Sequence, residues 1–183
     1  KSTPYQPDDL VAPLSVYGKS KEQGEALIRK HHADKSIVIR TSWVYSTTGN
    51  NFVKTMIRLM DERSELRVVA DQIGSPTWSW NLARAIWHLV DADVQAGTWH
   101  WTDTGVASWY DFAVAIYEEA SSIGLLDKPV TIHPIVSSQY PTPARRPHYS
   151  VLDTTSLRAL PGIQSEHWRT ALKQMLLELK DQR

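Results

Sequence analysis

Segments with helical periodicity alternate along this chain with short runs rich in β-branched residues, and this alternation most constrains the fold. The run "KSIVIRTSWVY" (35–45) is typical of a buried strand, and "ELRVVAD", "GTWHWTD" and "PVTIHPIV" read as further strands. Helical spacing covers 15–33, 52–63, 79–94 and 168–180, and Ser108 with Asp111 forms a capping box before one more helix. The pattern predicts an α/β fold.

Composition narrows the class of protein. The 183 residues suffice for one domain, or a domain with a small annex, and 42% are hydrophobic. A formal net charge of zero argues against nucleic acid or an anionic membrane as main partner. Without cysteine there are no disulfides or thiolate metal sites. No apolar run is long enough to span a membrane, and "KSTPYQPDDL" does not resemble a signal peptide, so we expect a cytoplasmic protein.

The stretch "SVYGKSKEQGEALI" (15–28) places an ionisable pair four residues apart, Tyr17 and Lys21. On a helix both side chains share one face. An adjacent ammonium favours the phenolate, so a Tyr in this setting can exchange a proton with an alcohol or alkoxide. The small neighbours Gly18, Ser20 and Gly24 would allow a flat ligand to approach. The alternative is an exposed helix with an ordinary Tyr and a solvated Lys, because short motifs match often by chance.

Four motifs in one order give a resemblance to a family. "YGKSKEQGE", "IVIRTSWVYSTTGNNFVKTM", "VVADQIGSPT" and "YPTPARRPHYSVLD" resemble the dTDP-4-dehydrorhamnose reductases, which are extended short-chain dehydrogenase/reductases. The first motif is shared by the whole superfamily, whereas the last two are much narrower. The resemblance implies the C-terminal part of a Rossmann-like fold with a small α/β substrate-binding domain. Residues 1–50 would be a remnant of the dinucleotide-binding domain, and 51–183 mainly the substrate-binding domain.

The resemblance also implies a reaction. NADPH or NADH would reduce the C4 keto group of a dTDP-linked 4-keto-6-deoxyhexose, giving dTDP-L-rhamnose. Tyr17 matches the family's proton donor, and Lys21 matches the Lys that tunes it and holds the nicotinamide ribose. Mg²⁺ has been attached to some relatives, and the sequence neither supports nor excludes it. The seven His residues show no metal-ligand motif.

Two parts of the family's pattern are missing from the sequence. No G-x-x-G-x-x-G occurs, although such a turn holds the cofactor's pyrophosphate in this fold. The family's catalytic Ser or Thr before the Tyr is missing too. We therefore expect a C-terminal fragment that is inactive alone, in which the strand at 36–42 has an exposed edge.

Further candidate substrate-binding residues follow the strands. Trp43 lies in the loop that lines the sugar pocket in the superfamily, or it packs as an edge aromatic. Asn51 caps the next helix or binds the nucleotide sugar. Either Arg145 or Arg146 could bind the diphosphate, with a surface or carboxylate-paired Arg as the alternative.

By resemblance, a further motif, "DQIGSPT", shapes the nucleotide end of the pocket; the alternative is a plain turn around Pro76. It contributes Asp71, Gln72 and Thr77.

Two other functions stay open at this point. The chain could be a non-catalytic regulatory or binding subunit of the same fold, which would have no need of Tyr17 and Lys21. It could also belong to a nucleotide-sugar epimerase or dehydratase, although the two narrow motifs argue against that. A homodimer is an open possibility.

Overall fold

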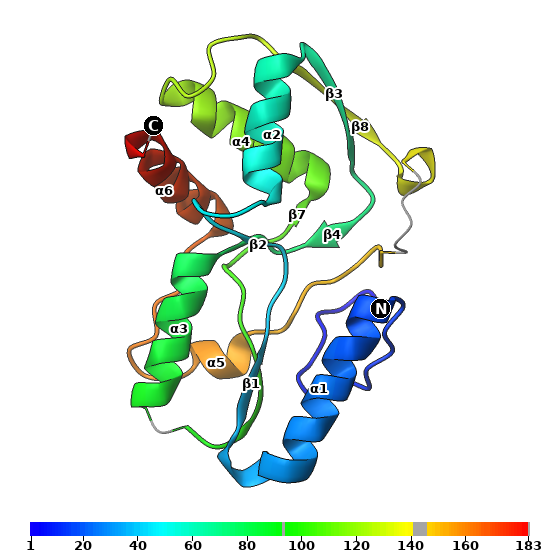
Figure 1. Ribbon diagram of the computed structural model, residues 1–183, viewed down its shortest axis with the longest axis vertical. Coiled ribbons are helices and arrows are strands. Elements are labelled where there is room, and N and C mark those ends of the chain that lie inside the picture. Colours follow the sequence, from blue (N-terminus) through cyan, green and yellow to red (C-terminus); the bar gives the residue numbers. More distant parts are fainter. Residues whose placement is uncertain (93, 141–145, 183) are drawn as a thin grey trace.

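The computed structural model describes residues 1–92, 94–140 and 146–182, and it has the α/β architecture that the sequence predicts (Figure 1). The elements form two halves, each around its own apolar cluster. One half contains the first strand and the Tyr–Lys helix. The other is built around three helices and a parallel strand pair.

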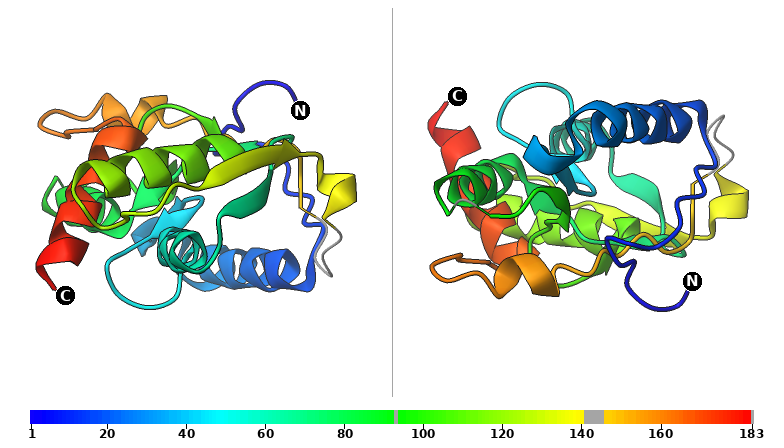
Figure 2. Two further views of the ribbon diagram at one scale, coloured as in Figure 1. Left: turned by 90° about the horizontal axis from the view of Figure 1, so that it is seen from above. Right: turned by 90° about the horizontal axis from the view of Figure 1, so that it is seen from below.

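The smaller half is organised by a parallel pair of strands, β1 (Ile37–Arg40) and β6 (Gly97–His100). Around them lie α1 (Val16–His32), the short 3-10 turn η1 (Ala33–Lys35), α3 (Ser79–Asp91) and α5 (Thr155–Arg158). Figure 2 shows α1 and α5 on opposite faces of the molecule. Within the described residues β1 pairs with β6 alone.

The larger half packs helices on a second parallel pair, β3 (Glu65–Val69) and β8 (Thr131–Ile135). Its helices are α2 (Phe52–Glu62), α4 (Trp109–Ser122) and α6 (Trp168–Asp181), and η2 (Ser137–Gln139) follows β8. α4 lies at the centre, in contact with α2, α6 and both strands. The predicted capping box starts α4: the Ser108 hydroxyl accepts from the Asp111 N–H at 3.0 Å, and the Asp111 carboxylate accepts from the Ser108 N–H at 2.8 Å.

Two pairs of very short strands join the halves. β2 (Val44–Tyr45) runs parallel to β5 (Thr77–Trp78), and β4 (Ile73–Gly74) runs antiparallel to β7 (Ala107–Ser108). The predicted continuous strand over 35–45 is therefore divided, and the segment predicted as a plain break, "QIGSPT", contains β4 and begins β5. The division falls at Trp43, whose φ of 49° is incompatible with an extended strand.

The predicted division at residue 50 does not separate the two apolar clusters. The smaller cluster consists of buried Ala85, Leu89, Trp101 and Leu157, with Ile39 of β1 packed against them. Segments after residue 50 thus return to support the half that holds β1. The domain boundary itself stays a prediction about the longer fold.

Candidate functional site

The Tyr–Lys pair lies in the first turns of α1. The Ser15 hydroxyl caps this helix by accepting from the Gly18 N–H at 3.1 Å. The Lys21 Nζ lies 5.2 Å from the centroid of the Tyr17 ring, so the two side chains share one face as their spacing predicts. Tyr17 is 72% exposed. The pair is therefore accessible to a ligand, although neither residue lines the two cavities described below.

One of the small residues beside the pair has a packing role. A Cβ on Gly18 would lie 2.9 Å from Pro13 Cβ, so the missing side chain allows the N-terminal segment to pass close to α1. A Cβ on Gly24 would meet no atom within 4 Å. Of these two glycines, Gly24 is the one that keeps the open surface predicted for a flat ligand.

An ion pair anchors α1 on β1. No residue of α1 is buried, so apolar packing contributes little to its position. The Glu25 carboxylate accepts two hydrogen bonds from Arg40 of β1, from Nε at 2.9 Å and from Nη2 at 2.7 Å. The Arg40 guanidinium holds the pKa of Glu25 below its usual value and has its own pKa raised by the pair. Arg40 also donates to the Pro7 carbonyl at 3.2 Å, which ties the N-terminal segment to the same strand.

A cavity of about 490 Å³ opens in the larger half, between α2, β3 and the start of α4. Its lining combines an apolar floor with aromatic walls and a few polar groups. The lining residues are Trp43, Val44, Phe52, Thr55, Met56, Leu59, Arg67, Val68, Val69, Gln72, Trp109, Tyr140 and Arg146. This mixture is typical of a pocket for a flat, partly polar ligand.

Two indole rings form the aromatic wall of this cavity. Trp43 and Trp109 stack with their ring centroids 3.6 Å apart and their planes 7° apart. Phe52 packs against Trp109 at a centroid distance of 4.7 Å, and the Arg146 guanidinium lies 5.9 Å from the Trp109 ring. Stacked aromatic rings with a nearby guanidinium suit a ligand that combines a planar ring with a separate negatively charged group.

The charge of the lining favours an anion. The cavity is lined by two arginines, Arg67 and Arg146, and its described lining includes no carboxylate. Gln72 and Thr55 add hydrogen-bonding groups. A guanidinium can bind two phosphate oxygens at once in a bidentate contact, so a phosphorylated ligand fits these groups.

The predicted substrate-binding residues do not all lie in the cavity. Trp43, Arg146 and Gln72 line the cavity. Asn51 caps α2 instead: its Oδ1 accepts from the Lys54 N–H at 3.2 Å, and its Nδ2 donates to the Ser46 carbonyl at 2.7 Å. The predicted contact of Asn51 with the substrate stays a prediction. Arg145 lies outside the described residues.

Two residues of the "DQIGSPT" motif bond to the protein rather than line the cavity. Asp71 accepts from the Ser137 N–H at 2.8 Å and from its hydroxyl at 2.9 Å, which joins β3 to η2. Thr77 is buried, and its N–H donates to the Trp43 carbonyl at 3.2 Å. Asp71 and Thr77 therefore hold neighbouring backbone segments in place, while Gln72 of the same motif lines the cavity.

Sequence reasoning missed Trp109, Phe52, Tyr140 and Arg67. Trp109 is the first residue of the capped helix that follows Ser108 and is partly buried, and a large aromatic residue at the start of a capped helix could have marked it. Arg67 alternates with the buried Leu66 and Val68 along β3, so strand alternation could have pointed it away from the core.

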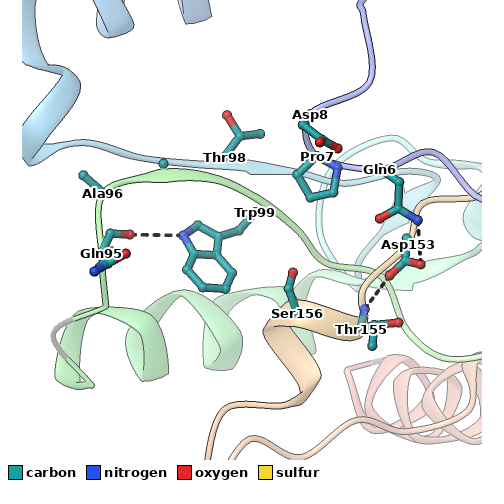
Figure 3. A pocket seen from close by; sticks show the side chains of 11 residues that line it. Gln6, Pro7, Asp8, Gln95, Ala96, Thr98, Trp99, Asp153, Thr155 and Ser156 are labelled. Atoms are coloured by element: carbon teal, nitrogen blue, oxygen red, sulfur yellow. Dashed lines mark hydrogen bonds between the residues drawn. The ribbon is translucent and has the colours of Figure 1, made fainter.

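A second, more open cavity of about 640 Å³ lies in the smaller half (Figure 3). It is lined by the N-terminal segment, the start of β6 and the start of α5, with Trp99, Gln6 and Asp153 among its side chains. Gln6 donates to Asp153 at 2.9 Å, and Asp153 accepts from the Thr155 N–H at 2.8 Å. The predicted site residues do not line it.

Within residues 1–92, 94–140 and 146–182, no three His, Cys, Asp or Glu side chains gather as a set that could hold a metal ion. None of the helices described combines the length and apolar character needed to cross a bilayer.

Comparisons with known proteins show the family to which this chain is similar. The family described as "RmlD substrate binding domain" matches residues 1–181. A dTDP-4-dehydrorhamnose reductase of Aggregatibacter actinomycetemcomitans is 44% identical over 94% of this chain and 60% of its own length. The chain thus spans about 60% of the length of this curated relative.

Two solved structures of dTDP-4-dehydrorhamnose reductases are also similar. The protein of Clostridium acetobutylicum is 39% identical, with a TM-score of 0.89, over 98% of this chain and 61% of that one. The protein of Bacillus anthracis, solved in complex with NADP, is 38% identical, with a TM-score of 0.87, over 96% of this chain and 59% of that one.

Proposed function

The chain belongs to the RmlD substrate-binding-domain family, and on this premise we propose that it is the substrate-binding part of a dTDP-4-dehydrorhamnose reductase. The observation that carries the proposal is the cavity, where stacked Trp43 and Trp109 lie beside the Arg146 guanidinium. A dTDP-linked sugar offers a flat base and a diphosphate, which match an aromatic wall and a cation.

The cavity holds the nucleotide end of this substrate. Tyr17 lies outside the cavity lining, so the reacting sugar carbon must extend from the cavity towards α1. Figure 1 shows that the beginning of α1 is the end nearer to the half with α2, α4 and β3. Trp43, on the loop between β1 and β2, stands between the two regions and can contact the deoxyhexose.

Tyr17 donates the proton in the proposed reduction. When C4 of the sugar receives a hydride, the C=O π electrons move to the oxygen, and the resulting alkoxide would take the phenolic proton of Tyr17. The Lys21 ammonium beside the ring stabilises the phenolate that remains. The exposed position of Tyr17 allows the phenol to be reprotonated from solvent.

The residues of α1 fit the nicotinamide end of a cofactor. Tyr17 and Lys21 present a hydroxyl and an ammonium on one accessible face, which are suitable partners for ribose hydroxyls. When bound, a reduced nicotinamide supplies the hydride. NADPH is the proposed form, because the similar Bacillus anthracis reductase was solved with NADP. A cytoplasmic location and a homodimer belong to the same proposal.

The test is NADPH oxidation with dTDP-4-dehydrorhamnose by the protein that carries this chain. Tyr17→Phe should lower kcat by roughly 100-fold or more, since general acid catalysis contributes about that much. Tyr5→Phe is the matched control, because the Lys1 Nζ also lies 5.2 Å from the Tyr5 ring. Wild-type kcat in Tyr17→Phe would refute the assignment. If the protein binds the dTDP-sugar without NADPH and does not oxidise NADPH, this result would favour a non-catalytic regulatory subunit.

A further inference from the structure

Gly74 of β4 lies directly against the indole of Trp43. A Cβ at this position would lie 2.5 Å from Trp43 Cε2, 2.6 Å from its Nε1 and 2.8 Å from Ser150 Oγ. The φ of Gly74 is outside the left-handed region, so the backbone there would accept any residue. The glycine is needed for space rather than for backbone conformation.

The strand that carries Gly74 is fixed on both sides. Gly74 pairs with Ala107, and Ile73 with Ser108, on the β7 strand that leads directly into Trp109. On the other side, the Ser150 N–H donates to the Ile73 carbonyl at 2.8 Å. β4 therefore cannot move away from Trp43 without breaking one of these pairings.

Trp43 has little freedom to give way while its stack is kept. Its backbone lies at a φ of 49°, and its carbonyl accepts from the buried Thr77. Its indole is confined between Gly74 and Trp109, 3.6 Å from the latter's ring centroid. Ser150, by contrast, approaches Gly74 with its hydroxyl, which can rotate away at the cost of its hydrogen bond to the Ile73 carbonyl at 3.1 Å.

We propose that Gly74 is a positioning residue of the cavity. Because Gly74 has no side chain, the Trp43 indole can pack directly against its backbone, and this contact sets the position of Trp43 in the Trp43–Trp109 stack. A methyl group at this position would displace the indole and break the stack. The expected effect on substrate binding rests on the proposed function, because a displaced Trp43 indole changes the shape of the cavity in which the nucleotide sugar would bind.

The experiment compares Gly74→Ala with Gly24→Ala in the 183-residue chain. Closely stacked indoles give an exciton couplet in circular dichroism, and Trp43→Ala identifies the part of the signal that belongs to this pair. Gly74→Ala should lose that couplet while keeping the helical signal. Gly24→Ala should keep it, because a Cβ there meets no atom within 4 Å. A wild-type couplet in Gly74→Ala overturns the proposal.

If Gly74→Ala folds poorly, a comparison of melting temperatures in two backgrounds tests whether Trp43 is the residue displaced. The proposal predicts that Gly74→Ala lowers Tm by roughly 4–8 °C in the wild-type background, as overpacking does in a domain of this size. In the Trp43→Ala background it should lower Tm by less than half as much. Equal losses in both backgrounds would show that Trp43 is not the residue displaced, and would overturn the proposal.

Titration with dTDP separates this inference from the proposed function. Gly74→Ala should weaken dTDP binding by roughly tenfold relative to Gly24→Ala, if the cavity is the nucleotide site. A wild-type chain that does not bind dTDP contradicts the proposed function, while the couplet and Tm comparisons still decide the role of Gly74.

Discussion

Replacing Glu25 by Gln should loosen α1, and with it the Tyr17–Lys21 pair, without unfolding the rest of the chain. α1 has no buried residue, so its position depends heavily on the two hydrogen bonds between Glu25 and Arg40. The side chains are only 15% and 21% exposed, which limits screening by water. Hydrogen bonds to charged groups contribute about 1.5–3 kcal/mol, so α1 should open roughly 10- to 150-fold more often.

Amide hydrogen exchange measures this opening directly. The α1 amides of Glu25→Gln should exchange faster by that factor, while those of α4 and α6 keep their wild-type rates. Glu62→Gln is the control: its partner Arg58 is an exposed neighbour on α2, and such surface pairs contribute little. Exchange in α1 that stays within about threefold of wild type would refute the role of this ion pair.

The same ion pair gives a pH dependence with a definite sign. The pKa of Glu25 is lowered below 4.5, chiefly by the hydrogen bonds from Arg40. A carboxylate with a depressed pKa stabilises the fold above its unfolded pKa and loses that contribution as the pH falls through its folded pKa. Protection of α1 should therefore decline in acid in the wild type and show a flatter profile in Glu25→Gln.

Three further predictions concern other parts of the chain. Burial raises the pKa of Asp103 to about 6, so the free energy of unfolding should fall by up to roughly 3 kcal/mol as pH rises from about 4 to 6. In denaturant titrations, the dependence of this free energy on pH should be weaker in Asp103→Asn. Asn51→Ala should lower Tm by roughly 2–4 °C through the lost cap, and unchanged dTDP affinity in this variant would exclude Asn51 from the nucleotide site. Calorimetry should find no micromolar binding of NADPH to these 183 residues alone, because Tyr17 and Lys21 offer few contacts and the sequence has no Gly-rich turn; a micromolar constant would contradict this.

The helices were predictable because their signals are local. The Ser108–Asp111 box, the Ser15 cap and the apolar spacing of α2 each lie within a few residues of the element that they specify. The strand run at 35–45 was predicted correctly in type but not in length. Its division at Trp43 depends on a positive φ that contacts with Gly74 and Trp109 hold in place, and none of these partners is close in the sequence.

The candidate site was predictable only in part, for the same reason. The spacing of Tyr17 and Lys21 placed them side by side, and the motif around Arg146 drew attention to a residue that does line the cavity. Trp109 stacks on a residue 66 positions earlier. Local periodicity carries no information about such a contact, so the main aromatic partner of the cavity could be found only from the fold.

The central claim is that the cavity beside Trp109 binds the nucleotide end of a dTDP-sugar, and calorimetric titration of the chain with dTDP tests it most directly. Wild type should bind with a micromolar constant, and Arg146→Ala should bind roughly 10- to 150-fold more weakly through the loss of a charge-assisted bond. Arg169→Ala is the control, because that guanidinium is paired with Glu118 and Glu119 outside the cavity lining. Equal dTDP affinity in wild type and Arg146→Ala, or no binding by wild type, would contradict the claim.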